Sequence, residues 1–449
     1  MTPERRGVTR EEIGPGAQLI MDPQPGQEIA AIHLFLRMGS SYETEEQSGL
    51  SNLMQNLLLK GTETLNAEEF EVRLDSLGSR LAGSTGKEVG SLSLLATGSV
   101  LREALDLMVD VIVKPAMAEE EFEKERELAL DEIQQRKDEL LSHAFDLFQE
   151  AFYGVHPLHK PVQGREEVLR DLKPEDVRSF HDRVYVPRNM IFSCSGHFDP
   201  GMVRDLLSRA VQGSPPGKSG IVGPVMEAEE KVKGGKGGAK KNTRSRREVL
   251  EARESAAAWI VLGYPAPSYG EDGCHEMQVA NAVLGGSMDS RLFTQLRERR
   301  GLAYQVSAVY RANTGPSFLA GYIGTDPRRY QEAVRELTAE FERLAQEEVG
   351  REELERAKEY LKGVFLIGGE TMSARAARRG KFEILGLGYD YGDEYLRRID
   401  RVTAEGLRGV AKRYLHDYAL GAVVPKGYEK PARRPKNGRK KPRSASGGS

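Results

Sequence analysis

Three amide side chains within five residues are the first feature of this sequence that could do chemistry. Asn52, Gln55 and Asn56 lie in the stretch Gly49-Leu-Ser-Asn-Leu-Met-Gln-Asn-Leu-Leu-Leu-Lys-Gly-Thr62. Residues three and four apart share one side of an α-helix, so a helix here would turn all three amides toward one spot. Histidines at positions 52 and 56 could hold a zinc ion, and a glutamate at position 55 could take a proton from its bound water. Amides are neutral, do not act as bases near pH 7 and are poor ligands for Zn²⁺. The stretch has the spacing of a metal site but not its ligands.

The same stretch predicts a buried helix. Apolar residues recur at the i, i+3, i+4, i+7 spacing of one helix face: Leu50, Leu53, Met54 and Leu57. Gly61 supplies the stop that commonly follows such a helix. A plainer interpretation makes the amides the solvent-facing stripe of an amphipathic helix. Leu59, which falls on the amide side, weakens that interpretation.

With His, Glu and His in place of the amides, this stretch would be the H-x-x-E-H zinc helix of the inverzincin peptidases. It resembles the zinc helix of the pitrilysin, insulinase and mitochondrial processing peptidase family at every position except those three. The resemblance implies that Glu132 matches the family's third zinc ligand and that Glu125 matches an acidic residue two turns earlier. In a helix so rich in Glu and Lys, both could instead be solvated surface charges. One retained carboxylate does not make a zinc site, so no metal is expected in this chain.

A second motif runs from Leu284 to Tyr304 and contains Arg297 and Tyr304, seven residues apart. It resembles the family's carboxyl-half signature, in which an Arg and a Tyr hold the substrate backbone beside the zinc. A guanidinium and a phenol hydroxyl can both donate to a carbonyl oxygen as it gains negative charge. The resemblance therefore implies that both residues bind substrate. The plainer alternative places Arg297 in an exposed charged run and Tyr304 in a core strand.

The remaining candidate ligands are histidines. His33 lies inside an apolar stretch and is predicted to be a packed strand residue. His156 and His159 are separated by Pro157, which disfavours a regular helical pair, so both are interpreted as loop residues.

Periodicity predicts the elements that position these residues. Alternating or continuous apolar runs predict strands at 17–21, 29–36, 91–94 and 189–196. Helix signals include a capping box at Asn66–Glu69, an apolar stripe from Leu101, a long charged helix at 118–143 and a start at 173–176.

The second half of the chain repeats the first. Ser41-Tyr42 recurs as Ser268-Tyr269, and three apolar residues recur at a constant offset: Leu105, Ile112 and Phe122 as Leu337, Leu344 and Leu354. Such offsets indicate an internal duplication. In the second copy the positions that match the three amides are Val279, Ala282 and Val283, so no metal chemistry is expected there.

Chain length and local composition predict the domain organisation. The 449 residues allow two to four domains. The predicted division is 1–213 and 249–425 as the two similar domains, 214–248 as a flexible basic Gly/Lys linker, and 426–449 as a disordered basic tail. Lys plus Arg number 65 and Asp plus Glu 68, so the net charge of −3 implies no global attraction to nucleic acid. Contact through the linker or tail is a lesser alternative.

The sequence also predicts where the protein resides. Cys194 and Cys274 lie far apart and form neither a metal motif nor a disulfide framework, which favours a reducing compartment. The amino terminus lacks an apolar signal region, and no apolar run is long enough to span a membrane. We expect a cytoplasmic protein without membrane contact.

The resemblance covers about Ala17 to Val424 and implies an α+β fold. Two duplicated halves, each an antiparallel sheet with packed helices, would form a clam shell around a cavity. It further implies a catalytically inactive subunit that pairs as a heterodimer with an active H-x-x-E-H chain, which carries the zinc, and helps to bind peptide substrate in a shared chamber. A scaffold with no peptidase role is the main alternative. An active zinc endopeptidase with substituted or engineered ligands is another.

Overall fold

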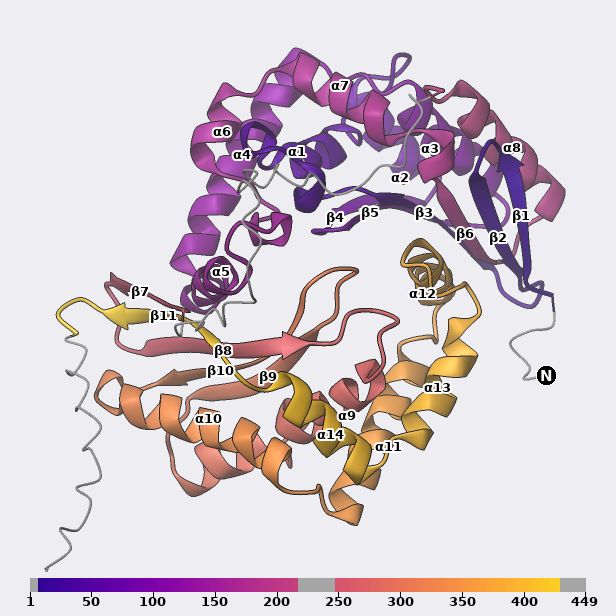
Figure 1. Ribbon diagram of the computed structural model, residues 1–449. Helices are drawn as coiled ribbons and strands as arrows, with labels where there is room; N and C mark the ends of the chain where they lie inside the picture. The colour runs from indigo at the N-terminus through magenta and orange to yellow at the C-terminus, as the bar shows by residue number, and fades with distance from the viewer. Residues whose placement is uncertain (1–6, 217–246, 429–449) are drawn as a thin grey trace, which may run out of the picture.

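The computed structural model describes residues 7–216 and 247–428 of the chain. Most of the predicted linker and tail lies outside these residues, so the character of both segments stays a prediction. The described residues form two halves, each built on one β-sheet, which face each other like two shells (Figure 1). The predicted α+β fold with two similar halves is therefore confirmed.

Six strands make up the first sheet: β1 Thr9–Gly14, β2 Ala17–Pro23, β3 Ile29–Arg37, β4 Arg80–Thr85, β5 Val89–Thr97 and β6 Ile191–Gly196. Their order is β1-β2-β6-β3-β5-β4. The strands predicted near residues 17 and 29 both form, but β6 lies between them, parallel to β2 and antiparallel to β3. Because β6 is central, all six of its residues are buried. The sequence prediction missed β1.

The second sheet has five strands: β7 Arg247–Arg253, β8 Ala258–Ala266, β9 Gln305–Arg311, β10 Ser317–Thr325 and β11 Ala419–Pro425. Their order is β7-β11-β8-β10-β9. The last strand is again inserted between the first two, parallel to β7 and antiparallel to β8. One parallel pair thus interrupts the predicted antiparallel pattern at the same place in both halves.

Helices of each half cover the outer face of its own sheet (Figure 1). In the first half these are α1 Leu50–Leu57, α2 Ala67–Ser76, α3 Leu101–Val113, α4 Glu119–Asp138, α6 Glu166–Asp171, α7 Pro174–Val184 and α8 Pro200–Gly213. In the second half they are α9 Cys274–Gly285, α10 Tyr330–Gln346, α11 Arg351–Ile367, α13 Tyr391–Arg401 and α14 Ala404–Tyr414. Short turns are η2 Ser40–Tyr42, η3 Glu45–Gln47, η4 Pro157–His159, η5 Pro187–Asn189 and η7 Pro327–Arg329, and η6 Phe293–Arg299 is a π-helix.

Most local signals in the sequence are confirmed. The four apolar residues of the α1 stripe are fully buried. Gly61 has φ +105°, a conformation that glycine adopts readily. The capping box at Asn66 forms in both directions, because its side chain accepts from Glu69 N and the Glu69 carboxylate accepts from Asn66 N. Within the described residues, no helix combines the length and the apolar character needed to cross a bilayer.

The long helix predicted at 118–143 is broken. α4 ends at Asp138, Glu139 leaves the helical conformation with ψ 94°, and α5 Leu140–Tyr153 begins in a new direction. α5 leaves its own half and packs on β8 and β11 of the second sheet. The matching helix of the second half, α12 Met372–Ile384, packs on β3 and β6 of the first sheet. The two exchanged helices lie between the sheets (Figure 1).

Small residues allow the exchanged helices to approach the sheets closely. A Cβ atom on Gly421 of β11 would lie 2.1 Å from the backbone nitrogen of Phe148, whose side chain is fully buried. On the other side, a Cβ on Gly380 of α12 would lie 2.3 Å from the Phe35 ring. A larger residue at position 421 or 380 would keep the helix from docking in its present position.

The inner faces also bury polar groups. His33 of β3 is buried beneath α12, and its Nε2 lies 3.0 Å from Ser373 Oγ. Burial lowers the pKa of His33 to about 4. The prediction that His33 is a packed strand residue is confirmed.

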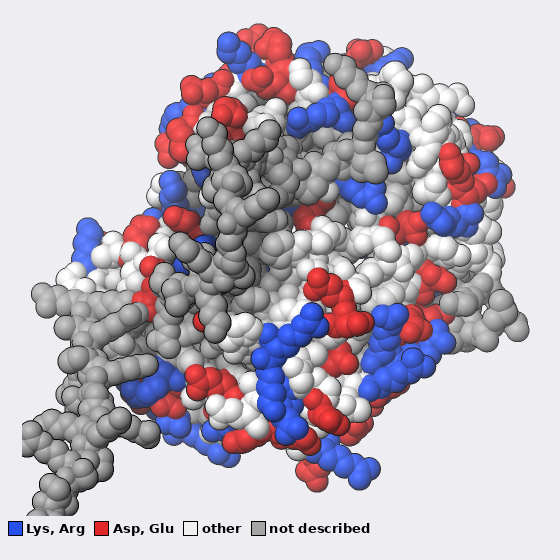
Figure 2. Space-filling model, viewed as in Figure 1, with Lys and Arg blue, Asp and Glu red and all other residues white. Residues whose placement is uncertain are grey.

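The outer surface carries charges of both signs. Lys and Arg side chains are interspersed with Asp and Glu over both halves of the face drawn in Figure 2. This mixture agrees with the small net charge of −3.

Replacement of Gly421 by Ala should destabilise the protein, because the added methyl group meets backbone atoms of α5. We expect a loss of about 1–3 kcal/mol in unfolding free energy. Gly409→Ala is the matched control, since a Cβ on Gly409 of α14 meets no atom within 4 Å. Thermal melting of both variants checks this prediction. A Gly421→Ala protein with the melting temperature of the wild type would contradict the close docking of α5.

Candidate functional site

Gln55 is more deeply buried than Asn52 and Asn56. It is fully buried, and both ends of its amide are bonded. Its Nε2 donates to the Ser91 carbonyl of β5 at 2.8 Å, and its Oε1 accepts from the Tyr185 hydroxyl at 3.0 Å. Asn52 and Asn56 are half-buried on the same helix. Gln55 is thus held in the core between the sheet and the end of α7, and the convergence of the three amides on one spot stays a prediction.

The surroundings of Gln55 suit an amide and disfavour a carboxylate. The Ser91 carbonyl needs a donor, which glutamine supplies and ionised glutamate does not. The space is also tight, because a Cβ on Gly83 of β4 would lie 2.9 Å from Gln55 Cγ. A charge at this position would be buried, with the Tyr185 hydroxyl as its one donor and no cation paired with it among the described residues.

A buried carboxylate anchors the start of α1. Glu43 accepts from Gly49 N at 2.9 Å and from Ser51 N at 2.7 Å, so it satisfies two amide groups at the start of the helix. Burial raises the pKa of Glu43 to about 7, against the opposing effect of these hydrogen bonds and of Lys160. Glu43 follows the Ser41-Tyr42 pair in the sequence, but no local pattern marks it as the cap of a helix that begins seven residues later.

The two candidate acidic residues of α4 have different environments. Glu125 is 5% exposed, and its carboxylate forms an ion pair at 3.0 Å with Lys60, which follows the end of α1. Glu132 is exposed. α1 packs on α4, so both helices of the predicted site are adjacent.

These donors do not fit a zinc ion. Asn52 and Asn56 offer neutral amides, Gln55 is bonded in the core, and the Glu125 carboxylate is already paired. In the part of the chain that the structure describes, no three His, Cys, Asp or Glu side chains are grouped to hold a metal. In the second half, Val279, Ala282 and Val283 are buried in the core beneath α11.

Arg297 and Tyr304 lie at the surface of the second half. Arg297 is exposed on the π-helix η6, with its guanidinium over the Phe293 ring at 5.0 Å. Tyr304 is 64% exposed, which excludes the core-strand alternative. Its backbone nitrogen donates to Gly324 O at 2.8 Å, which fixes the residue at the start of β9. Within residues 7–216 and 247–428, neither polar group of these side chains has a hydrogen-bond partner. Both are available to an external acceptor.

The two loop histidines are structural. His156 begins the turn η4, where its Nδ1 accepts from Leu158 N at 3.2 Å. His159 Nδ1 lies 2.9 Å from His156 O. Their prediction as loop residues is confirmed.

A cavity of about 840 Å³ lies between the two halves. Both sheets and both exchanged helices line it, with Phe35 and Val89 from the first sheet, Val309 and Tyr322 from the second, and Phe145 from α5. The predicted cavity of the clam shell is present.

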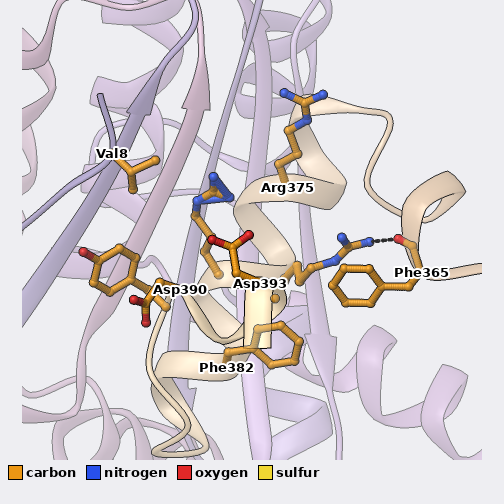
Figure 3. Close-up of a pocket in the computed structure, with 10 residues that line it drawn as sticks. Val8, Phe365, Arg375, Phe382, Asp390 and Asp393 are labelled. Atoms are coloured by element: carbon orange, nitrogen blue, oxygen red, sulfur yellow. Dashed lines mark hydrogen bonds between the residues drawn. The ribbon is translucent and has the colours of Figure 1, made fainter. Parts of the chain in front are cut away.

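A smaller pocket of about 220 Å³ lies where α12 meets α13 (Figure 3). Its guanidinium groups are engaged: Arg375 donates to Gly369 O at 2.9 Å, Arg378 donates to Phe365 O and lies over the Phe365 ring, and Arg379 lies 3.3 Å from Asp22 of β2. These contacts hold α12 against its neighbours, so the pocket is a structural junction.

Comparison with known families gives the decisive observation. Residues 19–166 match the family model described as Insulinase (Peptidase family M16), and residues 171–361 match the one described as Peptidase M16 inactive domain. The chain belongs to the M16 family of peptidases. The family resemblance of the sequence is thereby confirmed.

Relatives match this M16 chain over almost their whole length. An uncharacterized zinc protease of Bacillus subtilis is 27% identical over 414 residues, which cover 92% of this chain and 97% of the relative. One from Mycobacterium tuberculosis is 29% identical over 425 residues and 92% of each chain. Among solved structures, a protease from Helicobacter pylori aligns with a TM-score of 0.84 at 20% identity, over 93% of this chain and 99% of that one. A peptidase M16 inactive domain from Pseudomonas fluorescens aligns with a TM-score of 0.82 at 17% identity, over 95% and 100%. The similarity to these two solved structures shows the fold of the chain.

Replacement of Gln55 by Glu should destabilise this M16 chain, because the new carboxylate faces the Ser91 carbonyl. We expect a loss of about 1–3 kcal/mol near neutral pH. Burial raises the pKa of such a carboxyl, so the loss should shrink as the pH falls toward about 5 and the group takes up a proton. Denaturant unfolding measures both effects, with Asn52→Asp as the half-buried control. A Gln55→Glu protein as stable as the wild type would contradict the core position of this amide.

Glu43 should make stability depend on pH. Its folded pKa of about 7 exceeds the ordinary 4.5, so the folded state holds a proton that the unfolded state has lost between these values. Wild-type stability should therefore fall, relative to Glu43→Gln, by up to about 3 kcal/mol as the pH rises from about 4.5 to about 7. Denaturant unfolding of both proteins across this range measures the difference. A difference that stays constant would show that Glu43 titrates as in the unfolded chain.

Proposed function

We propose that this chain is a non-catalytic M16 subunit that pairs with an active H-x-x-E-H chain and helps to bind peptide substrate. The zinc and the water-activating glutamate belong to the partner in this proposal. The chain itself contributes Arg297 and Tyr304, whose side chains contact the substrate backbone in a chamber that the two subunits share.

The observation that carries the proposal is the contrast between the two motifs. At the zinc-helix positions the chain has amides, and Gln55 is built into the core by Ser91 and Tyr185. At the substrate-binding positions, Arg297 and Tyr304 are exposed, and their donors are not used within the described residues. A chain that had lost every peptidase role would have no use for this second pair.

The buried amide also bears on the alternative of an active enzyme with substituted ligands. A glutamate introduced at position 55 would face a carbonyl oxygen, so three substitutions toward H-x-x-E-H would not simply rebuild a working site. Metal analysis and a cleavage assay on the isolated chain separate the alternatives. Stoichiometric zinc together with peptide cleavage by the isolated chain would overturn the non-catalytic role.

We also propose a cytoplasmic location. Cys194 and Cys274 are both buried, and neither forms a disulfide. Structural disulfides are common in exported proteins and rare in the cytosol, so this cysteine usage supports the proposal. Cell fractionation tests it directly.

The substrate role predicts kinetic losses in the assembled pair. Arg297→Ala and Tyr304→Phe each remove one donor aimed at a carbonyl oxygen that gains charge, so kcat/KM should fall by roughly 10- to 1,000-fold for each. The two losses should not add, because both donors serve one group. The measurement is peptide cleavage by the chain purified together with an H-x-x-E-H subunit.

Matched controls are available in the same half of the chain. Arg299→Ala removes another exposed guanidinium of η6, and Tyr360→Phe removes an exposed hydroxyl of α11. Both should leave kcat/KM unchanged, and sizing should show intact pairs for all four variants. Full activity in the Arg297→Ala/Tyr304→Phe double variant of an intact pair would favour a scaffold without a substrate role.

A further inference from the structure

Strand β9 connects the predicted substrate-binding pair to the cavity between the halves. Tyr304 directly precedes the strand, and Arg311 is its last residue. Ala308, Val309 and Arg311 line the cavity. At about 3.4 Å per residue, an extended strand spans about 24 Å from Tyr304 to Arg311. A peptide held at Tyr304 and running beside β9 would therefore enter the cavity about four residues from the held carbonyl, at Ala308, and reach Arg311 about seven residues from it.

The described lining of this cavity is rich in positive charge. Four cationic side chains belong to it, Lys87, Arg136, Arg311 and Lys381, against one acidic residue, Glu88. Glu88 is already engaged, since both of its oxygens lie 3.1 Å from the Thr314 backbone nitrogen. The outer face of the molecule, in contrast, mixes both signs (Figure 2).

Two of the four cations are occupied and two are available. Arg136 forms a bidentate ion pair with Asp146, at 2.9 and 2.7 Å. Lys87 donates to the carbonyl oxygens of Leu158 and Lys160, both at 2.7 Å, but has no acidic partner. Arg311 and Lys381 are exposed to the cavity, and neither has a hydrogen-bond or ion-pair partner in the described part of the chain.

The cationic groups also influence one another. Arg136 and Arg311 both contribute to the lowered pKa of Lys87, after the larger effect of burial, while Asp146 opposes them. Burial between the cavity walls and the charge of Arg311 lower the pKa of Lys381. These groups are close enough to disfavour one another's positive charge. An anionic ligand would relieve that repulsion.

We propose that this cavity binds an acidic stretch of the peptide substrate through Arg311 and Lys381, about seven residues from the bond that is cut. The inference rests on the proposed function, because it assumes that Arg297 and Tyr304 hold the same peptide. It assigns a substrate class: peptides with Asp or Glu side chains at that distance from the cleavage site.

The cavity has the size and lining for such a segment. Its volume of about 840 Å³ falls within the range of about 300–1,000 Å³ that is typical of ligand sites. The apolar and aromatic side chains of Phe145, Val309 and Tyr322 can contact the backbone and side-chain stems of the peptide. Carboxylates would pair with the two available cations, and the pairing would be protected from full screening inside the cavity.

The test measures binding to the isolated chain, without cleavage. The probes are a fluorescein-labelled glutamate-rich peptide and a peptide of equal length in which every Glu is replaced by Gln. By fluorescence anisotropy at low salt, the acidic peptide should bind roughly tenfold more tightly. Added salt should reduce this preference. Equal affinity for the two peptides would overturn the proposal.

Substitutions locate the binding. Arg311→Ala/Lys381→Ala should abolish most of the preference for the acidic peptide. The matched control is Arg102→Ala/Lys412→Ala, which removes the same charge from exposed positions outside the cavity lining and should retain the preference. Circular dichroism confirms that both proteins fold. A preference that survives loss of Arg311 and Lys381, or that is lost equally in the control, would overturn the proposal.

A competition experiment tests nucleic acid, the other class of polyanion that could bind a cationic cavity. A single-stranded oligonucleotide that binds through Arg311 and Lys381 more tightly than the acidic peptide would overturn the assignment to peptides. Failure of the proposed function is distinguishable from all of these results. The proposed function fails if the Arg297 and Tyr304 variants keep the wild-type kcat/KM in the assembled pair. The binding test instead uses the isolated chain and the residues Arg311 and Lys381.

Discussion

Two helices, α5 and α12, cross between the halves, and the burial of each sheet depends on them. A sheet with two apolar faces must cover both. Here each half covers its outer face with its own helices and borrows one helix from the other half for its inner face. The close approach at Gly421 and Gly380 shows how tightly this arrangement is specified. The cavity exists because the two borrowed helices hold the sheets apart.

Much of this fold could be predicted from the sequence, where the signal is local. Apolar periodicity identified α1 and the strands β2, β3 and β6, and capping residues marked the start of α2. β1 was missed because Thr9–Gly14 is polar and pairs at the sheet edge, so burial leaves no pattern in it. The break at Glu139 was missed because no Gly or Pro marks it in the sequence, and α5 packs on the distant second sheet.

The candidate site shows the same division between local and distant determinants. Spacing on a helix placed Gln55 beside Asn52 and Asn56, but a helix presents a wide surface, and distant partners decide which side chains enter the core. For Gln55 those partners are Ser91 and Tyr185, which no spacing rule relates to it. Glu43 anchors α1 in the same long-range way. The exposure of Arg297 and Tyr304 depends on the turn between η6 and β9, whose path residues 300–303 do not define by any periodic pattern.

The contact between His33 and Ser373 joins residues 340 positions apart. Translation is sequential, so the strands of the first sheet, which are complete once β6 is made, must wait for α12. At about 5–20 residues per second, that wait lasts on the order of ten seconds or more. During this interval an apolar sheet face is exposed to water, and the nascent chain is open to aggregation. The exchanged helices thus make the protein most vulnerable while it is being synthesised, before the second half has closed over the first.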